Sequence, residues 1–180
     1  AEARRTADDL MRSDFFSRLL VDDKGAPLLR AEQLAGLAAS IRRIRFTRGE
    51  TVFRQGEPGE SCYVVVRGTA RGRVDYRDAA QANEFDIKAG ALFGEMSLVT
   101  GLPRTATVFA GEEVELLEIS KETFTSLLGM RDDIPQILAK LVAERAEQNR
   151  AMLEKLQSRG SANVGERIKS ASILTRFLRM

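Results

Sequence analysis

The sequence predicts an α+β fold, with an antiparallel β unit between helical segments at the two ends of the chain. Changes in hydrophobic period indicate this order. Apolar residues recur at helical spacing in residues 1–40, alternate with a period of two in residues 41–120, and return to helical spacing in residues 121–157. Glycine-containing turns divide the middle part into about eight short segments, which is typical of a closed or sandwiched antiparallel sheet.

The composition is that of an ordinary globular protein, with 43% hydrophobic and 30% charged residues in a chain of 180. This length fits one well-buried core with a helical appendage. The chain has no histidine and one cysteine, Cys62, which excludes imidazole bases, histidine metal sites and an internal disulfide. Cys62 opens the apolar run 62–66, where we expect a small buried residue. The net charge of +2 gives no argument for nucleic-acid binding, and no apolar run approaches the roughly 18 residues of a membrane span.

Residues 1–40 read as two helical parts around a break at residues 21–29, which contains Gly25 and Pro27. Apolar residues at helical spacing lie on both sides of the break: Leu10, Phe15, Phe16, Leu19 and Leu20 before it, and Leu34, Leu37, Ala38 and Ile41 after it. We expect these helices to pack against the β unit. A DNA-reading helix–turn–helix is the alternative, which the long break with acidic and basic residues disfavours.

Six segments have the β-branched and aromatic composition of strands: residues 41–46, 51–53, 62–66, 85–87, 105–110 and 114–119. The turn signals between them are residues 48–49 and 56–59, Gly68, Gly72, Gly90 and Gly111. Residues 75–85 carry no pattern, so we expect an exposed hairpin end that tolerates substitution.

Two helices are predicted after the β unit. Residues 121–130 form the first, and Asp132 or Asp133 can cap the second, with Pro135 in its first turn. The second continues to Gln157 without a breaker. Its apolar stripe should lie on the β unit and consists of Ile134, Ile137, Leu138, Leu141 and Val142. The far end, with Met152, Leu153 and Leu156, is expected to project or to pair with a partner helix.

The last 23 residues, 158–180, are predicted to be a linker followed by a basic amphipathic helix. Residues 166–180 carry Arg167, Lys169, Arg176 and Arg179 against one acidic residue, Glu166, among apolar residues at helical spacing. Such a helix suits a membrane surface or the groove of a neighbouring subunit. Folding back on its own domain is an equal alternative.

Residues 93–108, FGEMSLVTGLPRTATV, have the chemistry of a phosphate site. Gly94 allows a ligand to approach the backbone, and residues 95–100 can form a short helix whose N-terminal amides attract an anion. After a Gly-Leu-Pro turn, Arg104 can bind the same anion through two phosphate oxygens. Glu95 cannot bind an anion, but its carboxylate can accept hydrogen bonds from a sugar hydroxyl. Together these features predict a nucleotide.

This string resembles the phosphate-binding cassette of cyclic nucleotide-binding domains, which regulate catabolite activator-like proteins, cyclic-nucleotide-dependent kinases and cyclic-nucleotide-gated channels. The resemblance runs from about Arg45 to Arg145. It implies an eight-stranded antiparallel β-roll between an N-terminal helical bundle and two C-terminal helices. The implied boundaries are residues 1–157 for the domain, 1–40 for the bundle, 41–120 for the roll, 93–108 for the cassette, 121–157 for the C-terminal helices and 158–180 for the linker and tail.

The resemblance assigns a role to each cassette residue by position. It implies that Arg104 and the backbone amides from Gly94 to Met96 bind the cyclic phosphate, and that Glu95 binds the ribose 2′-hydroxyl. Thr105 falls where the family places Ala, Ser or Thr, and its hydroxyl offers modest discrimination between cyclic AMP and cyclic GMP.

Contacts to the base are implied at three further positions. Phe85 and Ile87 match the base-contacting strand of the family. Arg145 matches the last-helix arginine that caps the purine in several channel domains, although an arginine on a helix is ordinarily solvated. The N-terminal connection of residues 16–34 is longer than is usual in the family, which puts the packing of the bundle in question.

The function implied by the resemblance is ligand binding without turnover. We expect no catalytic residue, metal or cofactor, because the carboxylate near the cassette is needed for the sugar. Cyclic AMP or cyclic GMP binding would move the last helix and act on an effector outside the chain. The expected effector is the pore of a homo-oligomeric bacterial channel, with this domain on the cytoplasmic side of the inner membrane and without direct nucleic-acid contact. The alternative is a catabolite activator-type transcription factor without its DNA-binding domain.

Overall fold

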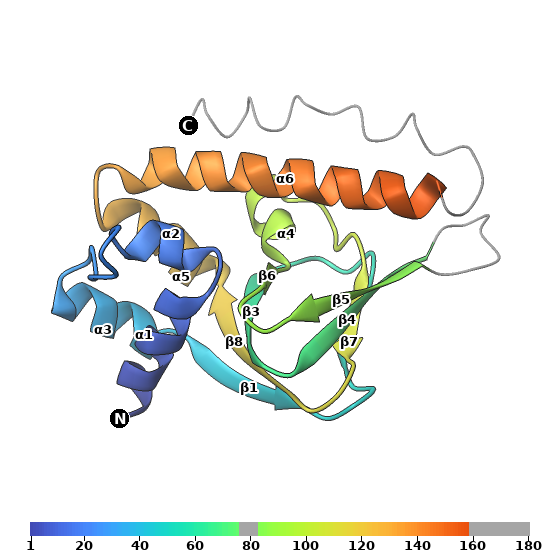
Figure 1. The fold of residues 1–180 in the computed structure, drawn as a ribbon, viewed down its shortest axis with the longest axis horizontal. Helices are drawn as coiled ribbons and strands as arrows, with labels where there is room; N and C mark the ends of the chain where they lie inside the picture. The colour runs from blue at the N-terminus through green and yellow to red at the C-terminus, as the bar shows by residue number, and fades with distance from the viewer. Residues whose placement is uncertain (76–82, 159–180) are drawn as a thin grey trace.

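The computed structural model describes residues 1–75 and 83–158, and it contains two four-stranded antiparallel sheets with helices before and after them (Figure 1). The helices are α1 (Glu2–Arg12), α2 (Phe16–Leu20), α3 (Ala31–Ala39), α4 (Glu95–Thr100), α5 (Lys121–Ser126) and α6 (Ile134–Ser158), with a 3-10 helix η1 (Leu127–Gly129). The strands are β1 (Arg42–Phe46), β2 (Thr51–Phe53), β3 (Ser61–Arg67), β4 (Thr69–Val74), β5 (Asn83–Lys88), β6 (Leu92–Phe93), β7 (Thr107–Ala110) and β8 (Val114–Ser120). The predicted α+β fold with an eight-stranded β-roll is confirmed.

Each sheet joins strands that are distant in the sequence. The strand order is β1-β8-β3-β6 in one sheet and β2-β7-β4-β5 in the other. Val64 of β3, for example, lies opposite both Leu117 of β8 and Leu92 of β6. The consecutive strands β3 and β4 belong to different sheets, and Gly68 makes the turn between them with a φ of 77°, which glycine adopts without strain.

Strand β3 separates two hydrophobic clusters, because its side chains alternate between the faces of the sheet. Tyr63 and Val65 face the cluster between the two sheets, whereas Cys62 and Val64 face the cluster that joins the sheet to the helices. Cys62 is fully buried, as the sequence predicts. Burial raises the pKa of its thiol, so the thiol stays protonated and unreactive.

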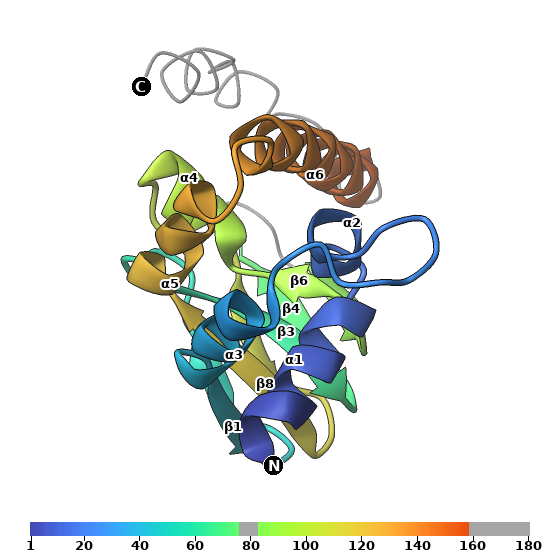
Figure 2. The same cartoon turned by 90° about the vertical axis from the view of Figure 1, so that its left-hand side faces the viewer.

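The N-terminal helices α1, α2 and α3 gather on the face of the sheet that contains β1, β8 and β3 (Figure 2). Leu10, Leu19 and Leu20 are fully buried there. The long connection after α2 is held by a hydrogen-bonded turn, in which the Asp22 carboxylate accepts hydrogen bonds from the amides of Lys24 and Ala26 at 2.9 and 2.8 Å. The bundle therefore packs on the roll despite its longer connection.

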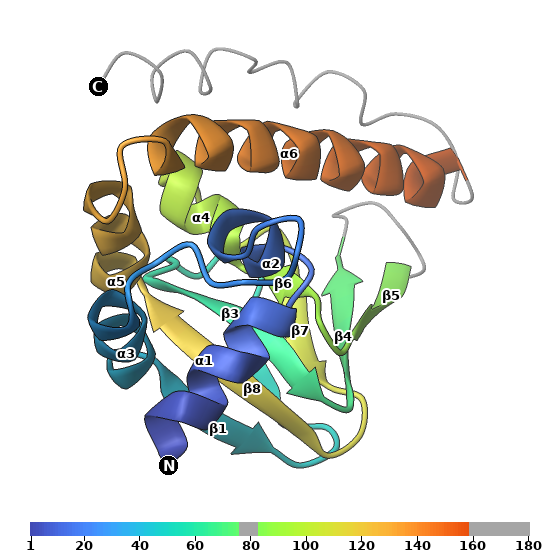
Figure 3. The same cartoon turned by 60° about the vertical axis from the view of Figure 1, so that its left-hand side comes forward.

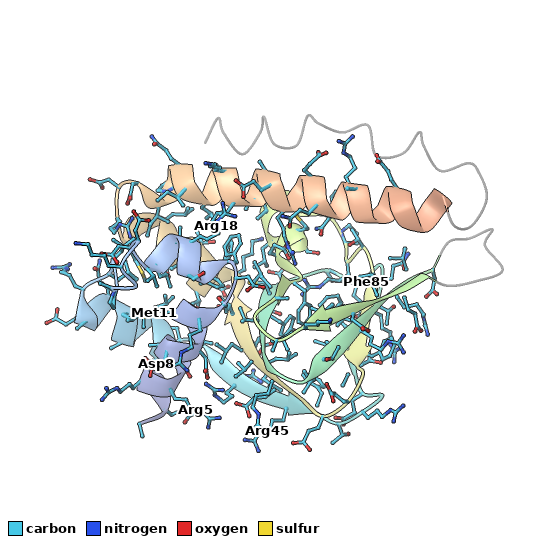
Figure 4. The ribbon with its side chains drawn as sticks, in the orientation of Figure 1. Arg5, Asp8, Met11, Arg18, Arg45 and Phe85 are labelled. Atoms are coloured by element: carbon cyan, nitrogen blue, oxygen red, sulfur yellow. The ribbon has the colours of Figure 1, made fainter. Side chains whose placement is uncertain are left out.

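A buried charge cluster fixes α1 to β1 and β8. Glu115 of β8 is 4% exposed and accepts hydrogen bonds from Arg43 and, at 3.0 Å, from Arg45. Arg43 also donates to Asp9 of α1 at 2.6 Å. Arg5 of α1 lies 3.4 Å from Glu115, and Arg5 and Arg45 appear at the same end of the molecule in Figure 4. The arginines outweigh burial and hold the pKa of Glu115 below its usual range.

Helix α6 crosses the molecule above α2 and α4 (Figure 3). Four residues of its predicted stripe, Ile134, Leu138, Leu141 and Val142, are buried in the cluster that joins sheet and helices, and Ile137 packs against that cluster. In the described part of the chain, no helix combines the length and the apolar character needed to cross a membrane.

Two strands and one turn differ from the sequence-based prediction. Strands β4 and β6 were not among the six predicted segments. Gly72 was predicted to be a turn but lies within β4, opposite Phe85. Glycine is needed at this strand position because the Phe85 ring occupies the space that a Cβ atom would take. The predicted hairpin end and tail lie mostly outside the described residues, and Ser158 is the last residue of α6.

Candidate functional site

The segment after β6 folds as the sequence predicts. Gly94 precedes α4 with a φ of 79°, and Gly101 follows it with a φ of 69°, conformations that favour glycine. The bounds of α4, Glu95–Thr100, coincide with the predicted short helix. The backbone of Arg104 then pairs with a neighbouring loop, where its amide donates to the Glu57 carbonyl and its carbonyl accepts from the Gly56 amide, both at 2.8 Å. These contacts fix the start of the Arg104 side chain.

The Arg104 side chain is a buried cation whose hydrogen bonds go to neutral carbonyl groups. The residue is 5% exposed, and its two terminal nitrogens donate to the carbonyls of Gly94 at 2.6 Å and Ser61 at 2.7 Å. Its guanidinium lies over the Phe53 ring. Among residues 1–75 and 83–158 it forms no ion pair, and its buried Nε has no hydrogen-bond partner. Burial lowers the pKa of Arg104, and the negative charges of Glu57 and Glu95 oppose this only in part.

Two glycines make room for the guanidinium. A Cβ atom on Gly94 would lie 2.8 Å from Nη1 of Arg104, and one on Gly59 would lie 2.8 Å from its Cζ and collide with Ser97. Any larger residue at either position would displace the arginine. Close packing around Arg104 therefore requires glycine at both positions, and the positive φ of Gly94 is a second reason for glycine there.

Glu95, at the start of α4, is the second buried charge and is paired with α6. It is 2% exposed, and its carboxylate accepts a hydrogen bond from Nε of Arg145 at 3.0 Å. Arg145 also donates to the carbonyl of Leu92. Burial raises the pKa of Glu95, and the positive charge of Arg145 opposes that rise.

Helix α6 makes a second ionic contact beside the first. Glu144 pairs with Arg18 of α2 at 2.6 Å, and Arg18 lies beneath α6 in Figure 4. A cavity of about 260 Å³ adjoins these contacts. Its lining comes from Asp14 and Phe15 before α2, Arg18 of α2, Ala91, Leu92 and four residues of α6, among them Glu144 and Arg145. Neither Glu95 nor Arg104 lines it, but Arg145, which bonds Glu95, does, so the cavity borders the cassette on the α6 side.

The structure brings four of the predicted site residues together. Arg104 contacts Gly94, and Arg145 contacts Glu95, which follows Gly94 in the chain. Met96 is half-buried in α4.

The other three predicted positions lie apart from these contacts. Thr105 is exposed next to Arg104. Ile87 is buried in the cluster between the sheets, and Phe85, labelled in Figure 4, packs against that cluster from β5. No hydrogen bond or ion pair connects Phe85 or Ile87 to the cassette in the described part of the chain.

Sequence reasoning missed four residues that shape the site. Ser61 and Leu92 contribute carbonyl oxygens, Phe53 contributes its ring, and Gly59 contributes the absence of a side chain. Carbonyl oxygens leave no signal in a sequence, because every residue has one. Gly59 was recognised only as part of a turn.

Comparison with known proteins identifies the family. The family model described as the cyclic nucleotide-binding domain matches residues 43–130, a range that contains Phe53, Ser61, Glu95 and Arg104. The chain belongs to the cyclic nucleotide-binding domain family.

Relatives of this cyclic nucleotide-binding domain belong to larger proteins of different kinds. A cyclic nucleotide-gated potassium channel of Mesorhizobium japonicum is 33% identical over 112 residues, which are 62% of this chain and 30% of the channel. The type II regulatory subunit of a cAMP-dependent protein kinase of Drosophila melanogaster is 32% identical over 131 residues, which are 69% of this chain and 34% of that protein. The chain thus spans about a third of the length of both curated relatives.

A solved structure supports the same assignment. The catabolite activator protein of Thermus thermophilus superposes with a TM-score of 0.60 at 28% identity, covering 72% of this chain and 61% of that one. The described residues contain no cluster of three or more acidic, cysteine or histidine side chains that would suit a metal ion.

Proposed function

We propose that this domain binds a cyclic purine nucleotide and passes the binding signal to an effector through α6. The observation that carries the proposal is the state of Arg104. It is a buried guanidinium whose contacts, within residues 1–75 and 83–158, are neutral, and whose Nε has no partner. A buried cation of this kind is stabilised by an anion, and a phosphate can accept hydrogen bonds from Nε and from a terminal nitrogen at once. Backbone amides from Gly94 to Met96 would share the phosphate.

Glu95 is the proposed hydrogen-bond acceptor for the ribose 2′-hydroxyl. Because Glu95 is also paired with Arg145 of α6, binding at this carboxylate would affect α6. A hydroxyl bound to Glu95 would share or replace the hydrogen bond from Arg145. Ligand binding would then change the stability of the contact that holds α6 on the cassette, which shifts the population of α6 positions. Arg145 would then turn toward the purine, and Phe85 and Ile87 of β5 are the other proposed contacts to the base.

Calorimetric titration with cyclic AMP and cyclic GMP tests the ligand. We expect micromolar affinity, which corresponds to about 8 kcal/mol. Replacement of Arg104 by Ala should cost about 2–5 kcal/mol of binding free energy, because the phosphate is left buried without its partner. Arg42→Ala is the matched control, since the Arg42 side chain is 77% exposed on β1. Tight binding by Arg104→Ala contradicts the assignment of Arg104 to the phosphate.

The proposed effector is the pore of a bacterial cation channel, and the domain would then lie on the cytoplasmic side of the membrane. Its likeness to the Mesorhizobium japonicum channel and the position of Arg145 on the last helix support this choice. The likeness to the Thermus thermophilus catabolite activator protein favours a second candidate, the sensor domain of a transcription factor. The coding sequence on either side discriminates between them: membrane-spanning segments before residue 1 indicate the channel, and a winged helix after residue 180 indicates the transcription factor.

The tail, residues 166–180, lies outside the described residues, and its role as a membrane or subunit contact stays a prediction, with folding back on its own domain as the equal alternative. Its four basic residues would each contribute about 1 kcal/mol at an anionic surface. A larger fraction of the full chain than of a chain ending at Gln157 should therefore sediment with anionic vesicles. Equal partitioning of the two chains would exclude the membrane role.

A further inference from the structure

We propose that Phe53 is a positioning residue, whose ring holds the Arg104 guanidinium ready for the incoming phosphate; this inference rests on the proposed function. The Cζ atom of Arg104 lies 4.1 Å from the centroid of the Phe53 ring. Cations within about 6 Å of an aromatic face are attracted by the negative potential of the ring. Phe53 ends β2, in the sheet that does not contain β6, so the two sheets meet around Arg104.

The ring adds a third point of support to the guanidinium. The other two are the carbonyls of Gly94 and Ser61, each bound to one terminal nitrogen. Gly59 and Gly94 leave no free space on the sides of the group that they face. An arginine side chain that is already ordered before binding loses less conformational entropy when the ligand arrives.

Phe53 is itself fixed by an aromatic cluster. Its ring centroid lies 5.9 Å from those of both Tyr63 and Phe93, which stack on each other at 5.2 Å. The Ser61 hydroxyl donates to the Tyr63 oxygen at 2.9 Å, and the Tyr63 hydroxyl donates to Glu118. Ser61 therefore connects the two supports of Arg104, because its carbonyl binds the guanidinium and its hydroxyl binds the cluster under Phe53.

An aromatic ring suits this position better than a carboxylate would. A carboxylate would compensate the buried charge of Arg104 but would occupy the N–H groups that a phosphate needs. The Phe53 ring stabilises the cation through its face and takes up no hydrogen-bond donor. This agrees with the free Nε of Arg104 in the described structure. The cation is thus stabilised and oriented while it keeps its capacity for the ligand.

The test compares substitutions at Phe53 by calorimetric titration with cyclic AMP. Phe53→Leu removes the ring but keeps the apolar character, and we expect about 3- to 30-fold weaker binding. Phe53→Tyr keeps the ring and should restore most of the affinity. Phe46→Leu is the matched control, because Phe46 packs against the same cluster between the sheets and does not contact Arg104. In the Arg104→Ala background, Phe53→Leu should cause no further loss of cyclic AMP affinity, which NMR titration measures.

The outcomes separate this inference from the proposed function. Equal affinities of the wild type and Phe53→Leu, or an undiminished effect in the Arg104→Ala background, would overturn the positioning role. A folded wild type that binds no cyclic nucleotide would instead overturn the proposed function.

One further measurement needs neither a variant nor a ligand. The side-chain N–H signals of Arg104 in the free domain should be separately resolved and shifted by the ring current of Phe53. A single averaged signal, as expected for the exposed Arg42, would contradict the inference even if Phe53→Leu failed to fold.

Discussion

Replacement of Arg145 by Ala tests the contact that holds α6 on the cassette. The change removes the 3.0 Å hydrogen bond to Glu95 and the bond to the Leu92 carbonyl, and leaves a carboxylate that is 2% exposed without its partner. Breaking a buried pair costs about 3–5 kcal/mol, and an unsatisfied buried group costs about 1–3 kcal/mol. The Arg145 side chain is 29% exposed, so water can partly replace it. We therefore expect a loss of about 2–4 kcal/mol in the free energy of unfolding at pH 7.

Urea unfolding followed by circular dichroism measures this loss. Glu144→Ala, one residue away on the same helix, is the matched control and should change stability little, because its pair with Arg18 is exposed. In the Glu95→Gln background the loss caused by Arg145→Ala should shrink, since the buried charge is absent. Hydrogen exchange over residues 136–148 should quicken in Arg145→Ala, which distinguishes local release of α6 from global unfolding.

The pH dependence provides a further check with a definite sign. Burial raises the pKa of Glu95 in the folded state, and loss of Arg145 raises it further. The unfolded chain therefore releases this proton at lower pH than the folded chain, which destabilises the fold as the pH rises from about 4.3 through the folded pKa. The difference between wild type and Arg145→Ala should be large at pH 7 and small near pH 4. An unfolding free energy equal to that of the wild type at pH 7 would refute the reasoning.

Three other predictions concern separate parts of the molecule. Glu115 has a lowered pKa in the folded state, so its contribution to stability is present above about pH 4.3 and is lost as the pH falls through the folded pKa. Glu115→Gln should therefore lower the free energy of unfolding by about 1–3 kcal/mol at pH 7. In urea titrations the difference from the wild type should disappear at acidic pH. Thr105→Ala should change the ratio of cyclic AMP to cyclic GMP affinity about tenfold or less, and an unchanged ratio in calorimetry rules out Thr105 as the selector. Gly59→Ala should weaken nucleotide binding about tenfold, because the added Cβ would displace Arg104. Gly36→Ala is the control and should bind as the wild type does, since a Cβ there meets no atom within 4 Å. Similar affinities of the two variants would disprove the packing argument.

The cassette could be predicted from sequence because its chemistry is local. Gly94, Glu95 and Arg104 lie within eleven consecutive residues, and the helix between them has the predicted bounds. The support of Arg104 is non-local: Ser61 is 43 residues away, and its contribution is a backbone oxygen. The role of Phe53 likewise depends on how the two sheets meet, which no local pattern records.

Strand β4 was missed for a different physical reason. Its buried positions are Ala70, Gly72 and Val74, which do alternate with a period of two, but two of them are small. The hydrophobic pattern of a strand is weak when its own side chains are small and side chains of the partner strand fill the core. Here the Phe85 ring of β5 fills the space above Gly72. Small residues in a strand therefore indicate turns when they are read alone and close cross-strand packing when the partner is known.

The position of α6 follows from two neighbouring residues with unequal contacts. Consecutive residues on a helix point about 100° apart, so Glu144 reaches α2 while Arg145 reaches α4 and β6. The Arg18–Glu144 pair is exposed on both sides and is expected to contribute little, whereas Glu95 is buried and depends on Arg145. A ligand that alters the Glu95 contact therefore acts on the stronger of the two ionic contacts that hold the middle of α6. In the proposed mechanism the Arg18 pair and the buried apolar stripe act as a guide, which keeps a released α6 close enough to return when the nucleotide leaves.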